Sequence, residues 1–168
     1  MSERRPVTTA EVATLLIETV CVSGDSETQA LAELADALAV SAELLISEML
    51  FLRAFTVEFA LTLTLAEGHG REQVEAHYGQ HWERIDHESG EQVVPALEEH
   101  LQFYGEIVGE GQASALGLAT SVGVAFAQRC GAGDTQELVL LGGRMFGALL
   151  EEVSALLTEA EITMVSDS

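Results

Sequence analysis

The chain has 168 residues, of which 48% are hydrophobic and only 5% are aromatic. This length fits one domain, and the composition predicts a well-buried aliphatic core and argues against disorder. There are 28 acidic residues against seven arginines and no lysine, so the formal net charge is −21. A field of this sign repels phosphate groups, and we therefore expect neither a nucleic acid nor an anionic membrane surface as a partner.

The acidity has three explanations. It can be a plain solvated surface, an adaptation to concentrated salt, or a surface that mimics nucleic acid or chaperones a basic partner. The excess of glutamate over aspartate, 23 against 5, also fits helix propensity, and this weakens the explanation by salt. All three explanations stay open on the sequence.

Periodic apolar residues predict an all-α fold, a single-domain bundle of about six to seven helices that spans residues 1–168. The first helix begins with a capping box formed by Thr8 and Glu11. The ends near 1–7 and 161–168 show no helical pattern, and we expect them to fray. The expected helices cover residues 9–22, 26–40, 42–66, 71–87, 91–108, 112–129 and 134–159.

The helix near 42–66 is apolar on almost every side. Such a helix lies inside a bundle or in an oligomer interface, so we expect it at the centre of the fold. The alternation from Val57 to Leu65 also permits a strand, but no neighbouring segment offers a partner strand. The run contains Arg53 and Glu58, and it is too short and too charged to span a membrane.

Three charged side chains, Glu48, Arg53 and Glu58, interrupt this apolar helix at intervals of five residues. That spacing places neighbours about 140° apart, so they cannot pair well within the helix. They must reach solvent or pair with other helices, and Arg144 is a candidate partner for Glu48 or Glu58. The four residues predict either structural ion pairs or the polar anchor of an apolar ligand pocket or a dimer seam.

Four of the five histidines lie between residues 69 and 88, beside the chain's single tryptophan. His77 and His81 are four residues apart on one helix face and could share a divalent transition metal. The sequence has no HExxH, CxxC or paired ExxH motif to complete such a site. The alternatives are the polar margin of an ordinary helix and a pH-responsive contact. Further metal ligands would have to come from His69, His87, Glu99 or His100.

Small residues recur every four positions in the sixth expected helix. This spacing forms a smooth groove that another backbone can approach closely. An interior glycine costs a helix about 1 kcal/mol relative to alanine, so the glycines indicate that the space is needed. We expect Gly142, Gly143 and Gly147 of the last helix to pack there. The two small-residue series are Ala113, Gly117, Ser121 and Ala125, and Ala115, Ala119, Gly123 and Ala127.

No GxSxG motif and no phosphate-binding loop occurs, so a non-enzymatic protein is the preferred interpretation. Cys21 and Cys130 lie in no motif and are expected in or near the core of a cytoplasmic protein. The preferred hypothesis is an all-helical binding protein, homodimeric through its third, sixth or seventh helix, that binds a protein partner or a small apolar ligand. The alternatives are a metal-binding protein, with or without enzymatic activity, built on residues 69–88, and an acidic mimic or chaperone of a basic partner.

Overall fold

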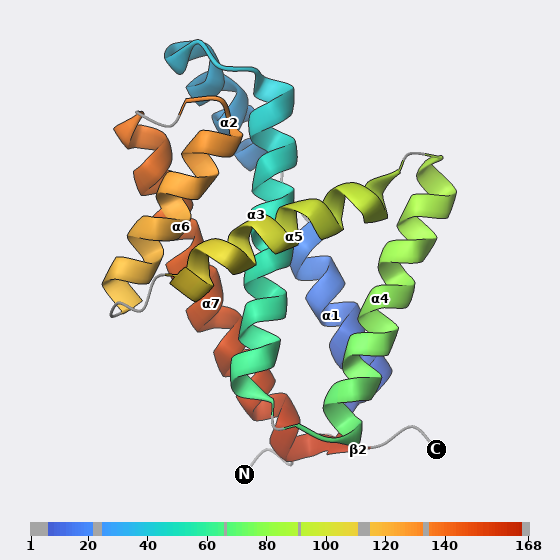
Figure 1. The fold of residues 1–168 in the computed structure, drawn as a ribbon. Helices are drawn as coiled ribbons and strands as arrows, with labels where there is room; N and C mark the ends of the chain where they lie inside the picture. The colour runs from blue at the N-terminus through green and yellow to red at the C-terminus, as the bar shows by residue number, and fades with distance from the viewer. Residues whose placement is uncertain are drawn as a thin grey trace.

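The computed structural model describes residues 7–21, 25–65, 67–90, 92–110, 115–132 and 135–165. Within these ranges the chain forms an all-α bundle of seven helices, with one short pair of strands (Figure 1). This confirms the predicted fold class. The helices are α1 (Thr9–Cys21), α2 (Asp25–Leu38), α3 (Ala42–Thr64), α4 (His69–Ser89), α5 (Val93–Glu110), α6 (Ala115–Arg129) and α7 (Gln136–Thr163).

Helix α3 lies at the centre of the bundle, as its all-apolar pattern predicted. It contacts α1, α2, α5, α6 and α7 (Figure 1). Ser41 caps its start, since the Leu44 amide donates a hydrogen bond to the Ser41 side chain at 3.2 Å. The segment from Val57 to Leu65 is helical up to Thr64, so the alternative of a strand there is wrong. In this segment Val57, Ala60 and Leu61 are buried at helical spacing, whereas Leu63 is exposed.

Of the ends that we expect to fray, residues 1–6 and 166–168 lie outside the described residues, and the parts that the structure describes are regular. Strand β1 (Val7–Thr8) pairs in parallel with β2 (Met164–Val165), with Val7 opposite Met164. Helix α7 therefore continues to Thr163, beyond the predicted end at 159. Backbone hydrogen bonding between segments far apart in sequence keeps both of these ends regular, and no local pattern could show it.

Hydrogen bonds to side chains also cap the starts of α1 and α5. The Glu11 amide donates to Thr8 Oγ1 at 3.0 Å and the Thr8 amide donates to Glu11 Oε2 at 3.3 Å, which confirms the capping box. At the start of α5, the Val93 amide donates to Asp86 Oδ1 at 2.6 Å. Asp86 belongs to α4, and Gly90 at φ 69° turns the chain between the two helices. This contact holds α5 across α3, where the site described below is built.

Helices α6 and α7 pack as closely as their small residues predicted. A Cβ atom added at Gly123 would clash with the carbonyl oxygen of Val139, and one at Gly143 would lie 2.8 Å from the carbonyl oxygen of Ala119. An added Cβ at Gly147 would meet nothing within 4 Å, so that glycine does not serve the contact. The positions at which an added Cβ would be crowded by the partner helix are Gly123, Gly142 and Gly143.

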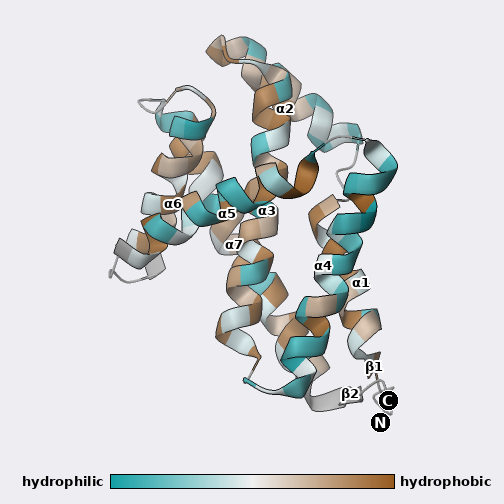
Figure 2. Ribbon diagram, turned by 45° about the vertical axis from the view of Figure 1, so that its right-hand side comes forward, coloured by the Kyte–Doolittle hydropathy of each residue, from teal (hydrophilic) through white to brown (hydrophobic). Residues whose placement is uncertain are grey.

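The buried apolar residues form two clusters along the bundle. One joins α1 and α4 to the second half of α3 and the C-terminal half of α7. The other joins α2, α5 and α6 to the first half of α3 and the start of α7. Helix α4 keeps a largely hydrophilic outer surface (Figure 2). Two pockets lie beside α3, one bordered by Arg53 and the other by Glu58.

Candidate functional site

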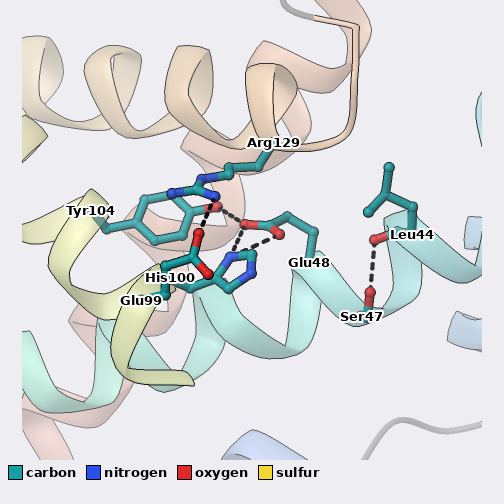
Figure 3. Close-up of polar contacts among 7 residues, drawn as sticks. All are labelled: Leu44, Ser47, Glu48, Glu99, His100, Tyr104 and Arg129. Carbon is teal, nitrogen blue, oxygen red and sulfur yellow. Dashed lines mark hydrogen bonds and ion pairs between the residues drawn. The ribbon is translucent and has the colours of Figure 1, made fainter. Parts of the chain in front are cut away.

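Glu48 is almost completely buried, with 1% of its surface exposed, and its partners come from α5. The Tyr104 hydroxyl donates to Glu48 Oε1 at 2.7 Å. His100 Nδ1 lies 3.0 Å from Glu48 Oε2 (Figure 3). We call these three residues the polar triad. The structure therefore gives Glu48 partners other than the suggested Arg144, which is exposed on α7.

The polar triad buries the Glu48 carboxyl group in the core, and the nearby Cys130 thiol is not activated. Burial and the Glu48 carboxylate raise the pKa of Cys130 to about 12, so this thiol is protonated at neutral pH. The same two causes raise the pKa of Tyr104, which keeps its phenol as a hydrogen-bond donor. The His100 ring stacks on Phe51 with 4.1 Å between ring centroids. The arrangement is that of a structural anchor between α3 and α5.

Arg53 borders a pocket of about 660 Å³ between α1, α2 and α3, which we call the apolar pocket. Arg53 is 7% exposed and forms an ion pair with Glu27 of α2. Burial lowers the pKa of this guanidinium, and an arginine remains charged at neutral pH all the same. Most of the pocket wall is aliphatic, formed by Val20, Leu31, Ile46, Met49 and Leu50.

Glu58 borders a second pocket, of about 430 Å³, between α3, α4 and α5, which we call the acidic pocket. Burial, and next the charge of Glu75, raise the pKa of Glu58 to about 7. Tyr78 and Trp82 also line this pocket, and each is only 3% exposed. The carboxylates on its wall belong to Glu58, Glu75, Glu83 and Glu98.

The four histidines predicted as metal ligands lie in different surroundings. His81 Nε2 is 3.3 Å from the Thr14 hydroxyl of α1. His77 is half-buried one turn earlier, His87 is exposed near the end of α4, and His100 belongs to the polar triad. In the part of the chain that the structure describes, no three His, Cys, Asp or Glu side chains are placed to hold a metal ion. The structure thus does not bring these four histidines together.

Sequence reasoning missed Tyr104 as the partner of Glu48, and it placed Tyr78 on the apolar face of α4 without connecting it to a site. Tyr104 follows His100 by four residues, so both side chains face α3 from the same side of α5. That spacing was available in the sequence, but its target, Glu48, is 56 residues away from Tyr104. Cys21, expected in or near the core, is exposed, because it is the last residue of α1, whereas Cys130 is buried as expected.

The chain has no significant match among protein-family models, curated proteins or solved structures. Of the helices in the described residues, none is both long enough and apolar enough to cross a bilayer. We therefore infer the function of this protein from its two pockets and the polar triad.

Proposed function

We propose that this protein is a non-enzymatic binding protein whose apolar pocket takes a small, uncharged and mainly apolar ligand. The observation that carries this proposal is a pocket of about 660 Å³ that is lined largely by aliphatic side chains and bordered by a buried arginine. Pockets that hold small molecules have this size range, and they combine an apolar lining with a few polar groups that orient the ligand. Arg53 is the polar group of this kind.

The charges around the pocket favour a neutral ligand. Glu27 already compensates Arg53, and Glu43 adds a further negative charge to the pocket wall. An anion would also meet the field of a chain with net charge −21. The N–H groups of Arg53 that Glu27 does not use can donate to a carbonyl or hydroxyl oxygen of an uncharged ligand.

Filling the apolar pocket should weaken binding of a neutral apolar probe. N-phenyl-1-naphthylamine gains fluorescence in an apolar environment, and titration with it measures occupancy of the pocket. Ile46→Trp places an indole in the cavity, and we expect it to weaken probe binding at least tenfold, about 1.4 kcal/mol. Displacement of the probe by neutral apolar compounds would then identify the class of ligand.

Leu63→Trp is the matched control. Leu63 lies on the same helix, is 63% exposed and does not line the apolar pocket, so this change adds the same side chain without filling the cavity. Probe binding that is equally strong in wild type, Ile46→Trp and Leu63→Trp would place the probe elsewhere and contradict the proposed function.

We further propose that the protein is a cytoplasmic homodimer. The free thiols of Cys21 and Cys130 fit a reducing compartment. Two large aliphatic side chains are exposed, Val124 on α6 and Leu140 on α7. Their exposure supports self-association or binding of a protein partner through these helices.

Native mass spectrometry of untagged protein, prepared without chelator, tests the dimer and the metal alternative together. A dimer appears at twice the chain mass of 17.9 kDa. A metal held by His77 and His81 would add its own mass and would disappear when both residues are changed to alanine. A monomer at micromolar concentration contradicts the dimer, and a metal-free mass in the wild type contradicts the metal alternative.

A further inference from the structure

The acidic pocket gathers carboxylates from three helices that are distant in sequence. Glu58 comes from α3, Glu75 and Glu83 come from α4, and Glu98 comes from α5. Glu58 is partly buried, and the other three are exposed at the pocket wall. Arg71 forms an ion pair with Glu75 at 3.0 Å and offsets part of this charge. The pocket therefore keeps a strong preference for a cation.

Two buried polar atoms, the Tyr78 hydroxyl and the Trp82 indole nitrogen, belong to residues that line the acidic pocket, and they lie close to each other. Tyr78 and Trp82 are each 3% exposed, and their rings meet edge to face at a centroid distance of 6.2 Å. Within the described residues, neither the Tyr78 hydroxyl nor the Trp82 indole nitrogen makes a hydrogen bond of good geometry. Leaving such groups buried and unpaired is costly, and native proteins usually satisfy them with water or a ligand. These atoms therefore point to an occupant of the pocket.

We propose that the acidic pocket binds a small aliphatic polyammonium ion, a diamine or triamine. Its ammonium groups would be bound by the separated carboxylates and by the oxygen of the Tyr78 hydroxyl. Its methylene chain would lie against Leu97 and Trp82, whose indole face also attracts a cation. An extended cation fits better than a single metal ion, because the described acidic side chains do not converge on one point.

Glu58 makes the proposed binding dependent on pH. Its pKa is about 7 in the free protein because it is buried and faces Glu75. The other titratable groups around it in the pocket are Tyr78 and Glu83 on α4 and Glu98 on α5. A polyammonium ion binds the ionised form of Glu58 more tightly, so affinity should rise as pH increases through 7.

Trp82 allows a direct test, since it is the only tryptophan in the chain and lines the pocket. Its emission is titrated with spermidine at about 150 mM salt, where long-range attraction to the acidic surface is screened. Magnesium chloride at equal ionic strength and 1,4-butanediol serve as controls for charge and for the methylene chain. We expect a saturable change in emission with spermidine alone. The absence of a change, or an equal change with magnesium, would overturn the proposal.

Matched variants separate the pocket from the overall charge. Glu58→Gln should weaken spermidine binding at least tenfold, and Tyr78→Phe, which retains the Trp82 signal, should weaken it severalfold. Glu33→Gln removes the same charge from an exposed position on α2 and should change affinity less than twofold. Circular dichroism checks that each variant remains helical. Equal weakening by Glu58→Gln and Glu33→Gln would mean attraction to the overall field and would overturn the proposal.

The pH profile provides a second readout. Wild-type affinity should be about five- to tenfold weaker at about pH 6 than at about pH 8, and Glu58→Gln should lose most of this difference. An unchanged profile in Glu58→Gln would contradict the role of Glu58. This inference does not depend on the apolar pocket, and probe binding there should be the same in Glu58→Gln as in wild type.

Discussion

Replacing Tyr104 by phenylalanine should lower the free energy of unfolding by about 2–3 kcal/mol. The Tyr104 hydroxyl donates a 2.7 Å hydrogen bond to the buried Glu48 carboxylate, and it is fully buried itself. Phenylalanine fills the same space but leaves Glu48 with one donor fewer in a site that water does not reach. A hydrogen bond to an ionised group contributes more than one between neutral groups, which sets this magnitude. Urea unfolding followed by circular dichroism measures the change.

Tyr78→Phe is the matched control for this effect. Tyr78 is also a buried tyrosine, but its hydroxyl lacks a hydrogen-bond partner of good geometry among the described residues. Its removal takes away an uncompensated polar group, so the free energy of unfolding should stay within about 1 kcal/mol of wild type or rise. Equal losses in the two variants would show that the hydrogen bond to Glu48 does not stabilise the fold in the way described.

Replacing Gly123 by alanine should cost about 2 kcal/mol or more. Alanine is the better helix former by about 1 kcal/mol, so helix propensity alone predicts stabilisation. The added Cβ would clash with the carbonyl oxygen of Val139, and backbone of α7 can yield only if the two helices separate. Overpacking of this kind costs about 1–3 kcal/mol, and here a rigid backbone atom rather than a flexible side chain is in the way. Thermal and urea unfolding of the variant measure the loss.

Gly147→Ala tests the same substitution without the clash. Gly147 lies inside α7, and an added Cβ there meets nothing within 4 Å. We expect this variant to be as stable as wild type or more stable by up to about 1 kcal/mol. If Gly123→Ala were also neutral, α6 and α7 would have to be more loosely packed than the structure indicates.

Local patterns in the sequence predicted most of the secondary structure. Apolar periodicity identified the seven helices, and the capping box of Thr8 and Glu11 located the start of α1. Helix boundaries were less accurate where a distant residue decides them. Helix α5 begins at Val93 because Asp86 of α4 accepts its first amides, and α7 extends to Thr163 beside a strand formed with Val7 and Thr8.

The candidate site was predicted only in part. The sequence singles out Glu48, Arg53 and Glu58, because charged residues within an apolar helix need an explanation. In the structure Glu48 makes a buried hydrogen bond, and Arg53 and Glu58 each border a pocket. Their partners could not be identified from spacing along the chain, since Tyr104 and Glu27 come from other helices. The histidines of α4 were prominent in the sequence, but no described cluster of three ligands includes them.

By itself the sequence determined that this protein is an all-α bundle with α3 at its centre and with α6 and α7 in close contact. Helix periodicity, caps and small-residue spacing are local properties, so the sequence alone shows them. Only the tertiary structure decided which helices supply the partners of Glu48 and Arg53, and that four carboxylates line one pocket with Tyr78 and Trp82. The physical reason is that a helix presents its side chains in all directions. Which of them meet depends on how the helices cross, and that is set by packing over the whole core.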